Sequence, residues 1–154
     1  MRAEIRKNHT IHGDARPALI LVNWSNIMND DAYKAGRDIA VKMWGEEVAA
    51  ARESRATPFN RPFEDLVTKY CFGEVWAEKT LDPKTRSMIT LAALTALTKP
   101  NQIKVHVRGA IANGVSVDEI RAVLMHSAIY AGVPAGVEAF NAAREVLADM
   151  GLDK

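Results

Sequence analysis

The pattern of apolar and polar positions along the chain predicts a series of amphipathic helices. Residues 32–50 carry apolar side chains at helical spacing and are predicted to form one helix, followed by a polar loop over residues 51–59. No segment shows the sustained alternation of apolar and polar positions that is typical of a half-buried strand. The sequence therefore predicts an all-α fold, a compact domain of about six to seven helices.

Helix-start signals recur in the next part of the chain. Asn60 precedes Pro62, which predicts a helix that runs to about Cys71, with Gly73 in a turn where the chain changes direction. Asp82 and Pro83 repeat the same capping pattern. The helix that follows is apolar almost all round from Met88 to Leu97, so we expect it to be central and buried.

Three further helices follow from the same kind of signal. Lys99-Pro100 ends the apolar helix, and a new one is predicted from about residue 101 until Gly114 stops it. Ser116 and Glu119 have the spacing of a capping box, which predicts a helix up to Gly132. The last helix begins at Pro134 and ends at Gly151.

These helices are predicted to form one domain over residues 32–154. The sequence shows no internal repeat, low-complexity stretch or linker within this range. Residues 1–31 show no periodicity and are predicted to be an N-terminal arm, either loose or packed on a neighbouring subunit.

The composition of the chain limits which partners and which cellular compartment can be expected. The 154 residues carry a net charge of +1 with basic and acidic side chains interspersed, so no nucleic acid or anionic membrane is expected as a partner. A single cysteine, Cys71, excludes an internal disulfide and any CxxC motif, and it is expected to be a small core residue. The apolar stretch at residues 18–22 is too short to span a bilayer and lacks a signal-peptide cleavage site. We therefore expect a cytoplasmic protein.

Four histidines are the first candidates for chemistry. His9 and His12 lie in the unpatterned arm and are expected to be exposed and idle. His106 and His126 each lie in mid-helix, where a histidine is more often a hydrogen-bonded structural residue than a catalyst. No HExxH motif occurs and no carboxylate lies at ligand spacing from either of them, so no metal is expected.

Three other polar or aromatic residues extend the candidate site. Glu74 lies two residues before Trp76, where an indole can desolvate the carboxyl group and raise its pKa, although Glu74 can equally be a surface residue that caps the next element. Arg86 lies in the first turn of the apolar helix and can bind a substrate carboxylate with two hydrogen bonds, or form a salt bridge to Asp82 or Glu74. By themselves these residues indicate an acid/base pocket and nothing more specific.

Several motifs resemble the carboxymuconolactone decarboxylase family, and the resemblance covers about residues 32–150. They are YKAG at 33–36, GEVW at 73–76, LDPKTRSMITLAAL at 81–94, HVRGA at 106–110 and AIYAGVPA at 128–135. The family is similar in fold to the alkylhydroperoxidase-D-like helical proteins, which assemble as trimers or hexamers. The resemblance therefore implies a homo-oligomer.

The same superfamily contains thiol peroxidases, and the sequence departs from them at three positions. If the peroxidase histidine is aligned with His106, Lys99 and Gln102 stand where the two cysteines of the CxxC motif would be. Ser87 stands where the glutamate of the peroxidase proton relay would be. The chain therefore lacks the groups for disulfide chemistry, which favours the decarboxylase branch or a repurposed relative.

The resemblance implies a carboxy-lyase that converts 4-carboxymuconolactone to 3-oxoadipate enol-lactone without a cofactor, in the protocatechuate branch of aromatic catabolism (the β-ketoadipate pathway). Arg86 is expected to bind a carboxylate, His106 to donate a proton or a hydrogen bond to the oxyanion, and Glu74 to set the position of that proton. Trp76 is expected to form a wall of the site and His126 to bind a carboxylate. Two alternatives stay open: another lactone or keto acid as the substrate, or a non-catalytic helical oligomer that acts as a binding protein.

Overall fold

The computed structural model describes residues 30–153, which form seven α-helices and one π-helical segment. In chain order these are α2 (Asp30–Trp44), α3 (Glu46–Ser54), α4 (Arg61–Leu66), η1 (Val67–Trp76), α5 (Pro83–Ala96), α6 (Pro100–Ala112), α7 (Val117–Ala131) and α8 (Val133–Asp149). Within this range there is no strand, so the predicted all-α class is confirmed. No helix in the described part of the chain is long and apolar enough to cross a membrane. His9, His12, the stretch at 18–22 and nearly all of the predicted arm lie outside the described residues.

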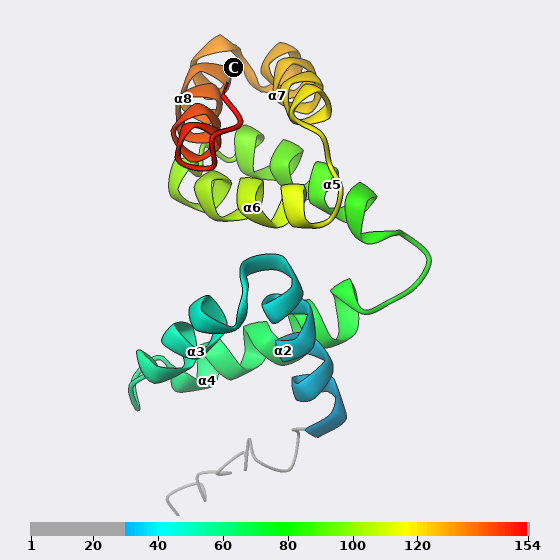
Figure 1. Cartoon of the computed structure of the whole chain (residues 1–154), viewed down its shortest axis with the longest axis vertical. Helices are drawn as coiled ribbons and strands as arrows, with labels where there is room; N and C mark the ends of the chain where they lie inside the picture. The colour runs from blue at the N-terminus through cyan, green and yellow to red at the C-terminus, as the bar shows by residue number, and fades with distance from the viewer. Residues whose placement is uncertain (1–29, 154) are drawn as a thin grey trace, which may run out of the picture.

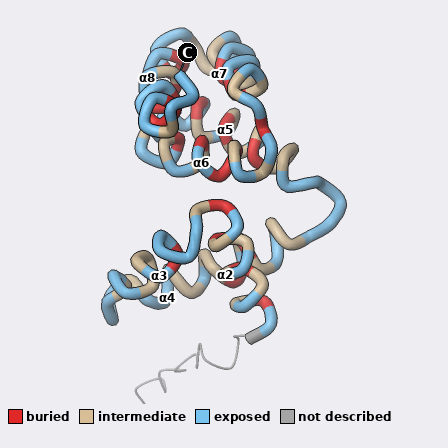
Figure 2. The backbone as a smooth tube through the Cα atoms, viewed as in Figure 1, coloured by how far each residue is buried: buried red, intermediate tan, exposed pale blue. Residues whose placement is uncertain are grey.

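The helices are arranged in two groups (Figure 1). Helices α2 to α4 and η1 form one group, α5 to α8 form the other, and the segment of residues 77–82 connects them. The main apolar core lies inside the second group, where buried positions face one another (Figure 2). Its largest fully buried apolar side chains are Leu91, Ile103, Val107, Ile120 and Leu124. Burial of these side chains is what stabilises the group of four helices.

Helices α2 and η1 pack with almost no space between their backbones. A Cβ atom on Gly36 of α2 would lie 1.8 Å from the carbonyl oxygen of Thr68, and one on Gly73 of η1 would lie 1.8 Å from that of Ala32. Only glycine permits such an approach, because every other residue carries a Cβ atom. These two glycines therefore set the distance between the two helices.

Most of the local capping signals are confirmed. The side chain of Asp82 accepts a hydrogen bond from the backbone N–H of Thr85 at 2.8 Å, and Ser116 and Glu119 form both hydrogen bonds of a capping box. Pro100 and Pro134 lie in the first turns of α6 and α8. Each of these signals involves residues within one helical turn, so the sequence alone is enough to reveal it.

The first half of the chain corrects several predictions. The predicted helix over residues 32–50 is interrupted at Gly45, whose φ of 88° lies in the left-handed region, and α3 then continues to Ser54 inside the predicted polar loop. Gly73 lies within a helix and not in a turn, since η1 extends to Trp76. The Asn60 side chain does not cap α4, because its oxygen accepts a hydrogen bond from the backbone N–H of Thr57.

The prediction that α5 is buried all round is also wrong for the single chain. Leu91 is fully buried, whereas Ile89 is 53% and Leu97 is 64% exposed. One face of α5 therefore packs inside the four-helix group, and the opposite apolar face is left uncovered.

The close approach of α2 and η1 predicts the effect of Gly36→Ala. In an open helix this change would stabilise the protein by up to about 1 kcal/mol. Here we expect the free energy of unfolding to fall by about 1–3 kcal/mol, since the methyl group meets backbone atoms that cannot move aside. Urea unfolding measures the difference, with Lys34→Ala on the exposed side of α2 as the control. A Gly36→Ala protein as stable as the wild type would contradict this packing.

Candidate active site

His106 lies where the two groups of helices meet. Its imidazole is on α6, with its ring centroid 5.8 Å from that of Trp44 at the end of α2 and 6.4 Å from that of Trp76 at the end of η1. The Trp44 ring meets the imidazole edge to face, at an interplanar angle of 80°, whereas the Trp76 ring is stacked at 27°. Phe72 contacts both indoles and closes the aromatic cluster.

Trp44 is a site residue that sequence reasoning did not identify as one. Its indole N–H donates a hydrogen bond to the backbone carbonyl of Val105 at 3.0 Å, which attaches the end of α2 directly to α6. Gly109 makes room for this contact, because a Cβ atom there would lie 2.5 Å from Cε of Met43 and 3.2 Å from the indole nitrogen. A glycine in the middle of a predicted helix was the available signal of a close approach.

The His106 imidazole is largely removed from water and has no polar partner among the described residues. Its Nδ1 atom is the one buried side-chain nitrogen or oxygen in the described part of the chain without a hydrogen-bond partner. Nε2 is likewise unpaired but is not buried, so it can be reached from outside. Burial lowers the pKa of His106 below its ordinary value near 6.5, because the charged form loses its hydration. The imidazole is therefore neutral at neutral pH and able to donate one hydrogen bond.

A cavity of about 550 Å³ lies beside Trp76. Helix α2, the segment of residues 77–82 and the end of α6 line it, with Trp76, Lys42, Glu78, Lys79 and Asn113 among the lining residues. His106 does not line this cavity itself, but Trp76 both lines it and stacks on His106. The volume is sufficient for a small organic acid.

Asn113 and Ser87 connect the cavity wall to α5. The Asn113 side chain donates a hydrogen bond to Oγ of Ser87 at 3.1 Å, and this hydroxyl group donates in turn to the carbonyl oxygen of Pro83 at 2.9 Å. Ser87 is buried. The chain therefore has a hydrogen-bonded structural hydroxyl where the peroxidases would carry a glutamate.

Arg86 and Glu74 are not joined to each other. Nη2 of Arg86 pairs with the carboxylate of Glu78 at 2.6 Å, a partner that sequence reasoning did not consider in place of Asp82 or Glu74. Glu74 is exposed, and its carboxylate makes no hydrogen bond or ion pair with any described residue, which in the single chain fits a surface residue better than a carboxyl group desolvated by Trp76.

His126 lies in a different place from His106. It lines a separate open cavity with Ala92 and Ala96 of α5, and its ring contacts that of Tyr130 at 4.9 Å. Cys71 is half-buried, and burial raises the pKa of its thiol, so the thiol is protonated at neutral pH. Of the predicted site residues, the structure thus brings Trp76 and His106 into contact and leaves Glu74, Arg86 and His126 apart from them.

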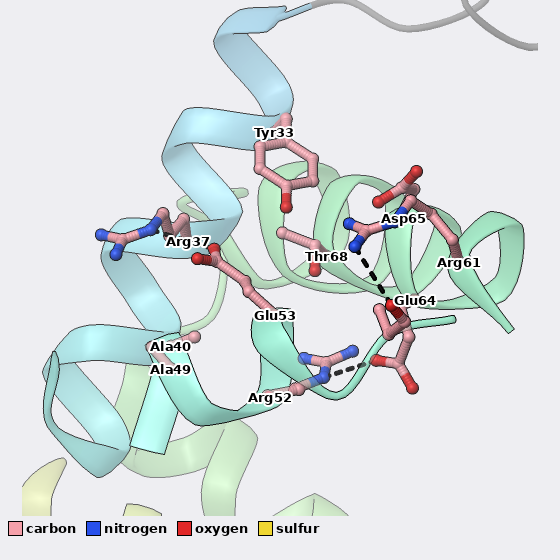
Figure 3. A pocket seen from close by; sticks show the side chains of 11 residues that line it. Tyr33, Arg37, Ala40, Ala49, Arg52, Glu53, Arg61, Glu64, Asp65 and Thr68 are labelled. Atoms are coloured by element: carbon pink, nitrogen blue, oxygen red, sulfur yellow. Dashed lines mark hydrogen bonds and ion pairs between the residues drawn. The ribbon is translucent and has the colours of Figure 1, made fainter. Parts of the chain in front are cut away.

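A cluster of charged side chains between α2, α3 and α4 is a structural feature and not a substrate site (Figure 3). Arg52 pairs with Glu64 at 2.7 Å and Arg37 pairs with Glu53 at 3.0 Å. Arg37 also pairs with Glu46, which lies outside this space. The space among these residues is about 20 Å³, which is room for about one water molecule. In the residues that the structure describes, no group of three or more histidines, cysteines or carboxylates is placed to hold a metal ion.

The comparisons with known proteins show the family to which the chain belongs. The model of the carboxymuconolactone decarboxylase family matches residues 61–145, which include Trp76, Arg86, His106 and His126. This match covers more than half of the chain, so the chain belongs to the carboxymuconolactone decarboxylase family.

Two curated relatives are decarboxylases. The chain is 34% identical over 126 residues to the 4-carboxymuconolactone decarboxylase of Acinetobacter baylyi, which covers 81% of this chain and 94% of the relative. It is 35% identical over 130 residues to the nitrosuccinic acid decarboxylase npaB of Metarhizium robertsii, and this match covers 82% of this chain and 91% of the relative. An uncharacterized 15.0 kDa protein of Paracoccus denitrificans is 32% identical over 116 residues, and this match covers 68% of this chain and 86% of the relative. The predicted enzyme class, a carboxy-lyase, is confirmed.

Burial of His106 predicts a specific dependence of stability on pH. Since its pKa in the folded protein lies below the ordinary value near 6.5, the unfolded chain binds the proton more readily. The contribution of the neutral imidazole to the free energy of unfolding is therefore complete above pH about 6.5. It is lost as the pH falls through the lower pKa of the folded state.

Urea unfolding at pH about 7.5 and about 5 should show this loss in the wild type and a smaller loss in His106→Gln, whose amide does not titrate. Equal losses in the two proteins would mean that other groups cause the pH dependence.

Proposed function

We propose that this protein catalyses the decarboxylation of 4-carboxymuconolactone to 3-oxoadipate enol-lactone without a cofactor, in the cytoplasm, as a step of protocatechuate breakdown. The observation that carries the proposal is the neutral, unpaired imidazole of His106, held against Trp76 beside a cavity of about 550 Å³. The similarity to a relative with that activity, over 94% of the relative's length, supports the choice of substrate.

The reaction needs no cofactor as an electron sink, because the substrate itself accepts the electron pair that the departing CO₂ leaves behind. The carboxylate that leaves is on the γ-carbon of an α,β-unsaturated lactone. When its bond to this carbon breaks and CO₂ departs, the electron pair moves through the double bond onto the lactone carbonyl and forms a dienolate. Protonation of the α-carbon then completes the product. The protein must bind the carboxylates, stabilise the oxyanion and provide access to a proton.

The described residues suit these roles in the following way. Trp76 lines the cavity and stacks on His106, and on this proposal the neutral imidazole donates a hydrogen bond to the developing oxyanion through Nε2, the ring nitrogen that is not buried. The lowered pKa of His106 favours this role over proton transfer from an imidazolium ion. We assign carboxylate binding to Arg86 and keep Glu74 as the group that sets the position of the proton.

A second candidate substrate is another small acid that contains its own electron sink. The similarity to a nitrosuccinic acid decarboxylase favours this alternative. In nitrosuccinic acid the departing CO₂ leaves its electron pair on a carbon that bears a nitro group, which accepts the charge as the lactone carbonyl does. The two reactions share the need for oxyanion stabilisation next to a bound dicarboxylate.

We further propose that the protein acts as a homo-oligomer, a trimer or a hexamer. Three large side chains of α7 are exposed on one face, Met125 at 55%, Ile129 at 76% and Tyr130 at 80%. Val133 and Val137 of α8 are 70% and 52% exposed. An apolar surface of this extent is unfavourable in water unless another chain covers it. On this proposal His126 lies at the interface between subunits and not in the cavity beside Trp76.

The activity prediction concerns His106. Incubation with 4-carboxymuconolactone should release CO₂ and change the ultraviolet absorbance of the lactone. His106→Ala should lower turnover by about a hundredfold, because it removes the donor to the oxyanion. His106→Gln keeps a donor and should retain more activity; if the histidine instead transfers the proton, both variants lose about a hundredfold or more.

Lys34→Ala, on an exposed position of α2, serves as the activity control. Consumption of the lactone without release of CO₂ would contradict decarboxylation and would indicate another lactone reaction, such as isomerisation or hydrolysis. If nothing is consumed, nitrosuccinic acid is the next substrate to assay, and failure with both would favour a non-catalytic binding protein.

Light scattering tests the oligomer. The wild type should have three or six times the chain mass of 16.9 kDa. Ile129→Asp should lower the mass, because it places a charge in the covered apolar face. Phe59→Asp, at a 95% exposed position outside this face, should leave the mass unchanged. A wild-type protein with the mass of one chain would contradict the proposal.

A further inference from the structure

Arg86 is held in a fixed orientation by the segment that connects the two groups of helices. Its Nε donates a hydrogen bond to the carbonyl oxygen of Leu81 at 3.2 Å, and Nη2 donates to that of Glu78 at 2.9 Å. The Arg86 side chain is only 12% exposed. Two backbone carbonyls therefore fix the plane of the guanidinium group, which is the orientation that binding of a planar carboxylate requires.

One side of this guanidinium group is already occupied by a carboxylate of the chain itself. Oε2 of Glu78 accepts a hydrogen bond from Nη2 at 2.6 Å. Nη1 makes no hydrogen bond with any described residue, and it is not among the buried atoms that lack a partner. The Nη1–Nη2 edge, which can bind both oxygens of a carboxylate, is thus half-occupied by Glu78 and half-open.

Glu78 both lines the cavity and pairs with Arg86. Glu78 lines the cavity of about 550 Å³ and Arg86 does not, so a ligand in the cavity meets Glu78 first. The Glu78 side chain is 51% exposed, and its other oxygen, Oε1, accepts hydrogen bonds from the backbone N–H and the hydroxyl group of Thr80. These bonds from Thr80, and then the bond from Arg86, lower the pKa of Glu78, so the group is ionised at neutral pH. The Glu78 end of this ion pair is therefore open to solvent although the Arg86 side chain is not, so another anion can compete with the carboxylate for the guanidinium group.

We infer that Glu78 is an internal competitor for the Arg86 carboxylate subsite and is displaced when a dicarboxylate ligand binds in the cavity. The inference rests on the proposed role of Arg86 in binding the substrate. A ligand carboxylate replaces Oε2 of Glu78 on Nη2, takes the free Nη1 as its second donor, and leaves the bonds to Leu81 and to the Glu78 carbonyl in place. Glu78 therefore sets the affinity for the carboxylate without taking part in the chemistry.

Calorimetric titration with succinate tests this inference without relying on turnover. Succinate has the carbon skeleton of nitrosuccinic acid but no electron sink, so it binds without reacting. Glu78→Gln keeps one side-chain oxygen, which can accept from Thr80 or from Arg86 but not from both, and removes the charge, so we expect succinate to bind about two- to fivefold tighter. Adding Arg86→Gln to this variant should abolish the gain. Glu145→Gln, which removes the exposed partner of Lys104 elsewhere in the chain, is the matched control and should bind as the wild type does.

The uncharged analogue succinamide separates competition for charge from simple widening of the cavity. Its binding should not improve in Glu78→Gln. The inference is overturned if Glu78→Gln binds succinate no tighter than the wild type, if succinamide shows the same gain, or if neither protein binds succinate. A wrong substrate assignment would instead appear as absence of CO₂ release from 4-carboxymuconolactone with the succinate result intact.

Discussion

The hydrogen bond from the indole of Trp44 to the carbonyl of Val105 is the contact on which the arrangement of the site depends. It is 3.0 Å long and joins the last residue of α2 to α6, and the missing side chain at residue 109 leaves room for it, since a Cβ atom there would lie 3.2 Å from the indole nitrogen. The same indole meets the His106 ring at its edge, while Trp76 is stacked on it. His106 is thus positioned by two helices of the first group although it belongs to the second. A shift of α2 would change both the burial of the imidazole and the wall of the cavity beside Trp76.

The packing of α2 against η1 also fixes the position of Trp76 relative to Trp44. Gly36 and Gly73 place the two backbones at a separation that admits no Cβ atom, so the end of η1 is fixed relative to the end of α2. The π-helical winding of η1 includes a hydrogen bond from the N–H of Ala77 to the carbonyl of Phe72, five residues earlier. Such winding is rare and is often found at functional sites. Here it ends the helix at the tryptophan that connects the histidine with the cavity.

Much of the fold was predictable from the sequence where the determining interactions are local, although the local cap signal at Asn60 was wrong. The caps at Asp82 and Ser116 and the first-turn prolines of α6 and α8 depend on residues within one turn. The break at Gly45 and the course of the chain through Gly73 were not predictable in this way, since a glycine permits a turn and a close helix contact equally well. The site was predictable only in part. Trp76 and His106 meet as expected for a common site, whereas Trp44 required knowledge of which helix packs on α6.

The ion pair of Arg86 shows why residue roles inferred from a family pattern need the structure of the particular chain. Sequence spacing suggested Asp82 or Glu74 as partners, yet Asp82 uses its carboxylate to cap α5 and Glu74 points into solvent. The connecting segment turns so that Glu78 reaches the guanidinium group from eight residues away. An arginine side chain with little exposure to water needs a counter-charge when no ligand is bound, and a ligand carboxylate must replace that counter-charge in order to bind. Glu78 suits both requirements on the proposed role of Arg86, because its carboxylate neutralises the arginine and is itself half-exposed to solvent, where a dicarboxylate can compete with it.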